Sequence, residues 1–290
     1  MKVCLECLSK FENLNWVCPS CGFQPSKLDG LYIHSPEHAE DGDGGFKEDS
    51  FSNLYELEKK NFWFCSRNKL ISWALKKYKG NLNNFLEIGC GTGFVLNRLS
   101  KTFPQISLLG SEIFLNGLSF AKTRIPDGNF MQMDARKIPF IDEFDAIGAF
   151  DVLEHIKEDE LVLKQIYSAL KPSGILLISV PQHPFLWSKS DEYACHFRRY
   201  TNDNLVRLVR KSGFQIIKNT SFVFTLIPFM YFSRRRNLYK KRYNPSEEFQ
   251  ISKFMNFIFY LILYFEFICI TIGISFPFGG SRFIVASKRL

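Results

Sequence analysis

The sequence lacks an apolar stretch near its start that resembles a signal peptide. This absence favours a chain that begins and stays in the cytosol, where thiols are kept reduced. We therefore expect its eight cysteines to be free thiols or metal ligands, which excludes a disulfide framework. No internal repeat is visible either, so nothing indicates a repeat architecture.

Two common nucleotide-binding patterns are also missing from the glycine-rich segment at residues 85–93. A phosphate loop needs Gly-Lys-Ser/Thr, which does not occur there. The dinucleotide fingerprint is G-x-G-x-x-G, whereas Gly89, Gly91 and Gly93 follow the spacing G-x-G-x-G, with Glu87 just before them. A different nucleotide-like ligand and a glycine-rich turn without a ligand both remain open.

Basic residues outnumber acidic ones, and they are unevenly distributed along the chain. The 37 basic and 29 acidic residues give a net charge of +8, which favours an anionic partner such as nucleic acid, anionic lipid or a phosphorylated substrate. Six basic residues occupy positions 234–236 and 240–242. Many of the 31 phenylalanines lie in the last seventy residues, on both sides of this basic cluster.

The middle of the chain alternates short apolar runs with longer amphipathic segments, which is typical of a parallel sheet covered by helices. The predicted strands are residues 84–89, 106–111, 129–134, 144–150, 174–180, 214–220 and 282–288. The predicted helices are residues 54–78, 93–101, 114–124, 158–170 and 201–211. The segments expected along the chain are a cysteine module at 1–30, a flexible linker at 31–50, a helical segment at 51–80, a core at 81–220, a hydrophobic and basic insertion at 221–281, and a last strand at 282–290.

Four cysteines near the start form two C-x-x-C pairs. Two such pairs can place four thiolates tetrahedrally around zinc, and Gly22 eases the turn after the second pair. The pattern resembles a zinc ribbon, and because every ligand is a cysteine the metal is expected to be structural. The expected ligands are Cys4, Cys7, Cys18 and Cys21.

The ends of three successive predicted strands carry residues that suit a nucleotide-like cofactor. Glycines after the first strand admit a ligand close to the backbone, and the helix that follows offers its N–H groups to an anionic group. Glu112 ends the second strand, where a carboxylate can accept both hydroxyls of a ribose. Asp134 and Ala135 end the third, where a side chain can accept from an adenine amino group. Each acid alone could instead be a helix cap or a solvated loop residue.

Residues 84–220 resemble a class I S-adenosylmethionine-dependent methyltransferase. The segment 85–93 resembles the first motif of that family, 109–112 its ribose-binding strand, 133–140 its adenine-side motif, 144–156 its fourth strand, and 170–176 the turn into the fifth. The resemblance implies a Rossmann-like α/β fold with a seven-stranded, mostly parallel sheet whose last strand is antiparallel. The cofactor residues that it implies are Glu87, Gly89, Cys90, Gly91, Gly93, Glu112, Asp134, Ala135, Phe150 and Asp151, with Glu87 near the methionine amino group.

The cofactor determines the chemistry that the protein must support. Its sulfonium methyl group is already electrophilic, so the protein mainly holds a nucleophile in line and excludes water. An oxygen nucleophile would also benefit from a general base. The candidates are His155, His183, Asp191 and His196. Each histidine has a structural or surface role as its alternative, and Arg198 and Arg199 could hold an anionic group of the substrate or face solvent.

The apolar run at residues 254–278 is long enough to span a bilayer. A single span is not expected, because strands 214–220 and 282–288 would pair and the chain must return to the same side. The insertion is therefore predicted to dip into one leaflet beside its basic cluster, or to cover the substrate pocket with Glu266 hydrogen-bonded inside.

These patterns favour a methyltransferase for a small-molecule or lipid-linked acceptor, in the cytoplasm and peripheral on the inner face of an anionic membrane. An RNA methyltransferase that uses the zinc ribbon and basic cluster is the alternative. The sequence lacks the Asn/Asp-Pro-Pro-Tyr signature of enzymes that methylate base amino groups. A third hypothesis is a zinc-ribbon adaptor whose methyltransferase fold has lost activity.

Overall fold

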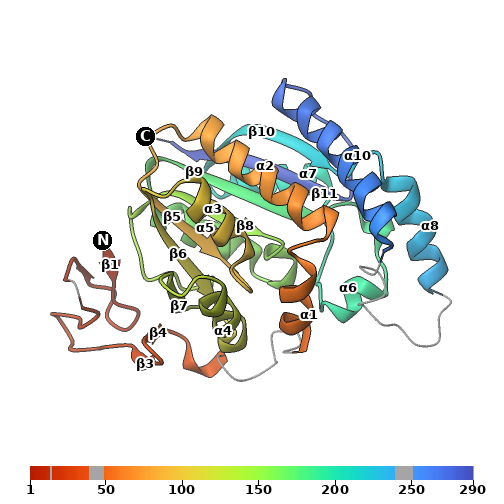
Figure 1. Ribbon diagram of the computed structural model, residues 1–290. Coiled ribbons are helices and arrows are strands. Elements are labelled where there is room, and N and C mark those ends of the chain that lie inside the picture. The colour runs from red at the N-terminus through yellow and green to blue at the C-terminus, as the bar shows by residue number, and fades with distance from the viewer. Residues whose placement is uncertain (14, 39–48, 239–250, 290) are drawn as a thin grey trace.

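The computed structural model describes residues 1–13, 15–38, 49–238 and 251–289 of the chain. Its centre is a sheet of nine strands in the order β10-β11-β9-β8-β5-β6-β7-β4-β3, with helices packed on both faces (Figure 1). The strands that match the predicted core are β5 (Asn84–Ile88), β6 (Ser107–Glu112), β7 (Asn129–Gln132), β8 (Phe144–Phe150), β9 (Leu170–Pro181), β10 (Phe214–Phe222) and β11 (Ser281–Lys288).

The central strands are covered on both faces. All seven residues of β8 are buried, as expected for a parallel strand between two helical layers. The helices that connect the strands are α3 (Phe94–Thr102), α4 (Leu115–Arg124), α5 (Asp159–Ala169) and α7 (Asn202–Lys211). Their bounds lie within one residue of the predicted ones, and the Rossmann-like α/β prediction is confirmed.

The last strand is antiparallel, as the resemblance implied. Strand β11 lies between β9 and β10, with Ile284 opposite Ile178 on one side and Asn219 on the other. The first five core strands run parallel, so their carboxyl ends meet at one edge of the sheet. Residues that follow these strands are therefore gathered into one site.

The prediction of a flexible linker at residues 31–50 is wrong for the first residues of that segment. Strand β4 (Leu31–Ile33) pairs parallel with β7, and β3 (Ser26–Leu28) pairs antiparallel with β4, which extends the predicted seven strands to nine. The reason is visible in the sequence Leu-Tyr-Ile, whose two aliphatic side chains are buried against the domain. Residues 39–48 of the expected linker lie outside the described residues.

Two helices replace the single helix that was predicted at residues 54–78. Helix α1 (Asp49–Leu57) ends before α2 (Phe62–Tyr78) begins. The break lies at Asn61, whose side chain accepts from the backbone N–H of Trp63 at 2.9 Å and caps α2. Strand β7 is also shorter than predicted, since it ends at Gln132.

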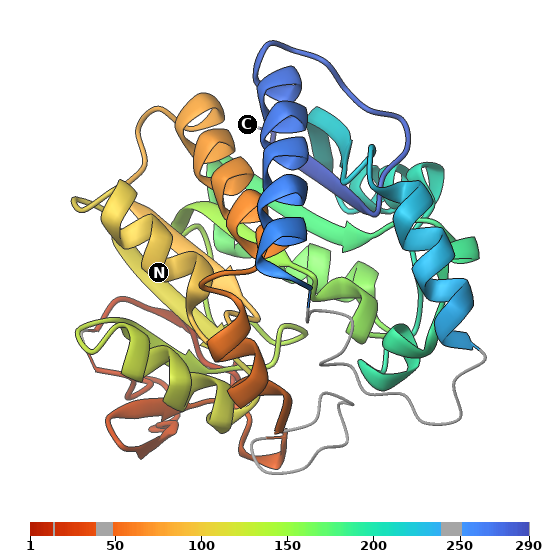
Figure 2. The same cartoon turned by 45° about the vertical axis from the view of Figure 1, so that its right-hand side comes forward.

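Two helices of the insertion form a cap on one side of the domain. Helices α8 (Ile227–Leu238) and α10 (Lys253–Thr271) stand beside the sheet, and α10 runs along α2 (Figure 2). Glu266 of α10 is buried and accepts from the backbone N–H of Thr225 at 2.7 Å and of Phe224 at 3.1 Å. The hydrogen-bonded Glu266 of the cover hypothesis is thus observed, whereas basic residues 240–242 lie outside the described residues.

Among the described helices, α10 alone is long and apolar enough to cross a bilayer by length and composition. Only 22% of its apolar window is buried inside the structure. Each end of the cap continues into a strand of the central sheet, because β10 precedes α8 and β11 follows α10.

Candidate active site

The glycine-rich loop connects β5 to α3 at the carboxyl edge of the sheet. Gly89 has a φ of 64°, and a Cβ there would lie 2.5 Å from Cγ2 of Val152, so a larger residue does not fit. Gly93 has a φ of 72° and is the N-cap of α3. Gly89 and Gly91 lie at the wall of a cavity, where a ligand can approach the backbone closely.

Two carboxylates lie beside this loop. Glu87 is buried, its Oε2 has no hydrogen-bond partner among the described residues, and burial raises its pKa well above the usual range. Glu112 accepts from the backbone N–H of Gly91 at 3.0 Å and of Ile113 at 2.8 Å, although burial still raises its pKa. A cationic group next to Glu87 would offset the cost of burying that charge.

The other two acids of the predicted cofactor site are paired with arginines. Asp134 accepts from Nε of Arg136 at 2.9 Å. Asp151 follows β8 in a left-handed conformation with a φ of 58° and forms an ion pair with Arg67 of α2. Each carboxylate is thereby held in place at the edge of the cavity.

One cavity of about 1400 Å³ collects almost all of these residues. It is larger than the roughly 300–1,000 Å³ of a typical small-molecule site, so a cofactor leaves room for a second substrate. Of the predicted cofactor residues, Gly93 does not line it, and those that do are Glu87, Gly89, Cys90, Gly91, Glu112, Asp134, Ala135, Phe150 and Asp151.

Three of the four candidate catalytic residues lie together on the wall of the same cavity. The rings of His155 and His196 are 4.6 Å apart, and Nδ1 of His196 is 2.9 Å from Oδ1 of Asp191. Burial and the neighbouring His196 lower the pKa of His155 to about 3. Burial alone would raise the pKa of Asp191, but its hydrogen bond to His196 and the charges of Arg199 and Arg234 lower it to about 2.

The remaining candidate residues, His183, Arg198 and Arg199, either lie outside the cavity or are bound by other protein groups. His183 does not line the cavity, and its ring stacks on Phe278 with centroids 5.4 Å apart. Arg199 lines the cavity but donates to Asp191 at 2.7 Å, and Arg198 pairs with Asp159. The two arginines therefore bind carboxylates of the protein itself.

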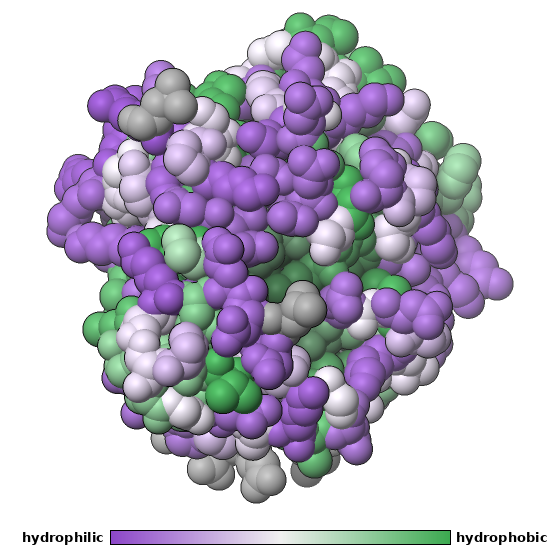
Figure 3. All heavy atoms as spheres, turned by 90° about the vertical axis from the view of Figure 1, so that its left-hand side faces the viewer, coloured by the Kyte–Doolittle hydropathy of each residue, from purple (hydrophilic) through white to green (hydrophobic). Residues whose placement is uncertain are grey.

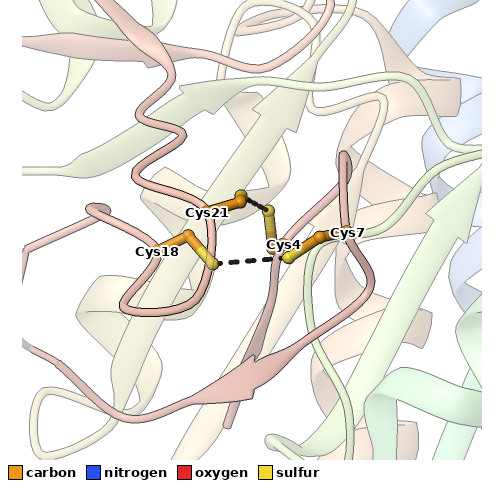
Figure 4. Close-up of side chains that lie close together, drawn as sticks. All are labelled: Cys4, Cys7, Cys18 and Cys21. Carbon is orange, nitrogen blue, oxygen red and sulfur yellow. Dashed lines mark hydrogen bonds between the residues drawn. The ribbon is translucent and has the colours of Figure 1, made fainter.

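The N-terminal cysteines lie close together at a separate site. The Sγ atoms of Cys4 and Cys21, and those of Cys7 and Cys18, are each 3.6 Å apart (Figure 4). All four sulfur atoms lie within 4.8 Å of one another. Zinc–sulfur bonds of about 2.3 Å in a tetrahedron require sulfur atoms about 3.8 Å apart, so this geometry suits zinc.

Residues 59–219, which include the glycine loop and all three carboxylate-bearing strand ends, match the family model described as a methyltransferase domain. This chain belongs to the class I S-adenosylmethionine-dependent methyltransferases. The match covers more than half of this methyltransferase, and the resemblance inferred from the motifs is confirmed.

Curated and solved methyltransferases show the same relationship. The chain is 27% identical over 115 residues to malonyl-[acyl-carrier protein] O-methyltransferase of Bacillus anthracis, which covers 39% of this chain and 43% of the relative. It is 31% identical over 150 residues to demethylmenaquinone methyltransferase of Lactobacillus johnsonii, or 48% of this chain and 59% of the relative. The methyltransferase thus spans about half the length of these relatives.

A solved structure extends the similarity to most of the fold. Phosphoethanolamine N-methyltransferase 2 of Haemonchus contortus, in complex with S-adenosyl-L-methionine, has a TM-score of 0.57 and 16% identity. The alignment covers 86% of this methyltransferase and 59% of that chain. At this identity the comparison supports the fold alone.

The sequence interpretation missed several residues of the methyltransferase cavity that come from its two N-terminal helices and the turn between them. Phe51, Glu58 and Arg67 all line it. Glu58 accepts from Thr92 of the glycine loop and pairs with Nη1 of Arg124 at 2.9 Å. No local pattern marks these residues, because they reach the site through tertiary packing.

Proposed function

We propose that this methyltransferase transfers a methyl group to a small-molecule or lipid-linked acceptor at a membrane surface. The observation that carries this proposal is the single cavity that joins the glycine loop to the apolar cap. Val223, Leu226, Met230 and Phe259 line its cap side. An acceptor with apolar parts suits such a lining, because burial of apolar surface stabilises the complex.

In this proposal the cofactor occupies the end of the cavity beside the glycine loop. The buried Glu87 faces the methionine ammonium, and Glu112 accepts from the ribose hydroxyls while it also holds the loop N–H of Gly91. Asp134 and Ala135 contact the adenine side, and Phe150 with Asp151 lies along the cofactor edge. The unpartnered Oε2 of Glu87 is what an ammonium group would satisfy.

The acceptor then lies between the cofactor and the cap, beside His155 and His196. The hydrogen bond from Nδ1 of His196 to Asp191 leaves Nε2 as the nitrogen that can face a substrate. The two bacterial relatives are named for malonyl-carrier-protein and demethylmenaquinone acceptors. Such names support an acceptor that is not a nucleic acid.

The outer face of the cap supports the membrane part of the proposal. Exposed apolar side chains recur every three or four positions along α10 and its C-cap residue and so form one stripe, which comprises Phe254, Phe257, Leu261, Tyr264, Phe265, Ile268 and Ile272. Phe229 and Phe232 of α8 are exposed as well. Apolar faces of this extent mark interaction surfaces.

Charge and orientation suit an anionic lipid surface. Arg235 lies exposed on α8, and residues 240–242 add three basic positions to the same insertion. Basic residues near an anionic leaflet stabilise binding by about 1 kcal/mol each. The side of the molecule that carries the N-terminal cysteines, on the left of Figure 1, has a mainly hydrophilic surface (Figure 3).

We propose further that Cys4, Cys7, Cys18 and Cys21 hold a structural zinc ion. The short β1 (Lys2–Val3) and β2 (Lys10–Phe11) cannot supply a core of their own. Four thiolates leave no open position on the metal, so its role is to fix the chain and not to take part in the reaction.

Methyl transfer from labelled cofactor onto fractionated cell extracts tests the acceptor class. We expect label in the organic-soluble lipid or small-molecule fraction, and none in RNA. Label in RNA that nuclease removes would overturn the proposal in favour of RNA methylation. A reaction with heat-denatured protein controls for chemical transfer.

Flotation with anionic vesicles tests the membrane surface. The double variant Phe257→Ser/Phe265→Ser is expected to lower vesicle binding by roughly 100-fold or more, since each buried phenylalanine contributes about 1.5–3 kcal/mol. The matched variant Leu28→Ser/Leu161→Ser removes two exposed apolar side chains away from the cap and should float like the original. Absence of flotation by the original protein, or equal flotation by both variants, would contradict the proposed membrane surface.

A further inference from the structure

Three potential metal ligands meet at the acceptor end of the cavity. They are a carboxylate oxygen of Glu154, an imidazole nitrogen of His155 and an imidazole nitrogen of His196. These three atoms lie within 4.8 Å of one another, and all three residues line the cavity. This Glu154–His155–His196 cluster is separate from the four cysteines and from the glycine loop.

Backbone hydrogen bonds hold the cluster together across two parts of the chain. Glu154 and His155 lie in the short helix η3 (Leu153–His155), which begins three positions after the last residue of strand β8. His196 follows α6 (Lys189–Tyr193), and the N–H of the next residue, Phe197, donates to the carbonyl of Glu154 at 2.8 Å. The sheet edge therefore places Glu154 and His155, and this backbone hydrogen bond ties the segment of His196 to them.

The burial of the Glu154 side chain without a hydrogen-bond partner indicates that a cation binds there. Glu154 is only 1% exposed, and neither carboxylate oxygen has a hydrogen-bond partner among the described residues. Nearby acids are paired, since Asp151 binds Arg67 and Asp191 binds Arg199, whereas no described basic side chain forms an ion pair with Glu154. A buried carboxylate without a partner is costly, and coordination to a metal ion removes that cost.

His196 has the arrangement of a metal-binding histidine. Its Nδ1 is hydrogen-bonded to Asp191, which fixes the ring and leaves Nε2 as the ligand atom. Histidines that bind metals usually donate their other nitrogen to a carboxylate in this way. Asp191 is itself held by Arg199 and by the N–H of Ser188 at 2.8 Å.

We propose that Glu154, His155 and His196 bind a divalent first-row metal ion of the Mn²⁺ to Zn²⁺ series. Two imidazoles and one carboxylate suit these ions and leave coordination positions open. The open positions face the cavity, where they would hold an oxygen of the acceptor. This part of the inference rests on the proposed function, and it identifies the acceptor as a hydroxyl compound.

The metal ion would prepare that hydroxyl for transfer. Coordination lowers the pKa of the hydroxyl, and its proton leaves to solvent. The resulting oxygen attacks the methyl carbon of S-adenosylmethionine as the carbon–sulfur bond breaks. The products are the methyl ether, neutral S-adenosylhomocysteine and the released proton, so charge and atoms balance.

Metal titration of the whole purified chain tests the site without an acceptor. Mn²⁺ binding is measured by the loss of the free-ion EPR signal, and Zn²⁺ by equilibrium dialysis with elemental analysis. We expect one Mn²⁺, and one Zn²⁺ beyond the cysteine-bound ion. Glu154→Gln and His196→Gln should each weaken Mn²⁺ binding by roughly 100-fold or more. This loss is larger than that expected for a residue that only supports a metal ligand.

Controls separate this inference from the proposed function. His183→Ala changes a histidine outside the cavity and should leave Mn²⁺ binding unchanged. Cofactor affinity is measured on the same samples by calorimetry, and its retention shows that the variants are folded. Failure of both ions to bind while the cofactor binds, or Mn²⁺ binding that survives both glutamine substitutions, overturns the metal site alone. Absence of cofactor binding would instead overturn the placement of the cofactor.

Discussion

Replacing Glu112 with alanine is expected to weaken S-adenosylmethionine binding by roughly 100-fold or more. The carboxylate is proposed to accept from two ribose hydroxyls, and hydrogen bonds to a charged group contribute about 1.5–3 kcal/mol each. The substitution also frees the N–H of Gly91, which Glu112 holds at 3.0 Å, so the glycine loop loses support at the same time. Isothermal titration calorimetry with the cofactor measures the change.

Two variants make this result interpretable. Glu112→Gln keeps acceptor oxygen but loses the charge, and an intermediate affinity is expected. Asp127→Ala removes an exposed carboxylate just beyond α4, in the same strand–helix unit, and should bind the cofactor as the original does. If Glu112→Ala bound the cofactor with unchanged affinity and a normal circular dichroism spectrum, the ribose role of Glu112 would be wrong.

Cys18→Ser is expected to remove zinc and to unfold the N-terminal segment. Structural zinc sites contribute an apparent 10–16 kcal/mol of binding free energy at neutral pH, and much of it is folding free energy. The loss should extend beyond the cysteines, because Trp16 packs on Phe140 with ring centroids 5.4 Å apart. Elemental analysis should find one zinc ion fewer per chain, and the fluorescence of Trp16 should shift to the red.

A second cysteine variant provides the comparison for this experiment. Cys65→Ser changes a half-buried thiol of α2, far from the zinc ligands in sequence, and should keep the full zinc content. Equal zinc content in Cys18→Ser and the original protein would contradict the four-thiolate site. Zinc loss with no change in Trp16 fluorescence would contradict its role in folding.

The core of the fold was predictable because its apolar runs, turn residues and amphipathic segments all indicated the same elements. The apolar run of β8 and the glycines around Gly89 are typical of a buried strand and of a tight turn. The strand predicted at residues 144–150 has the observed bounds. The break at Asn61 was missed because an apolar helical period continues on both sides of that residue. Strand β4 was missed because three residues are too few for a period to show.

The cofactor half of the cavity was predicted more completely than the acceptor half. Its residues follow successive strands, so parallel topology alone brings Glu87, Glu112 and Asp134 to one edge. Arg67 of α2 and Glu58 of the turn before it also line this cavity, and the spacing of residues in the sequence does not predict that contact. His183 was predicted as a candidate because it follows the fifth strand, but it does not line the cavity and its ring stacks on Phe278.

The position of β11 constrains the order in which this domain can fold during synthesis. The strand lies between β9 and β10 yet follows both in the chain, with the whole cap in between. The edge of β9 must stay unpaired until the ribosome has made the cap and β11, and this distant pairing closes a long loop. The apolar stripe of α10 therefore leaves the ribosome before the sheet is complete, so contact with lipid could precede the native state of the catalytic domain.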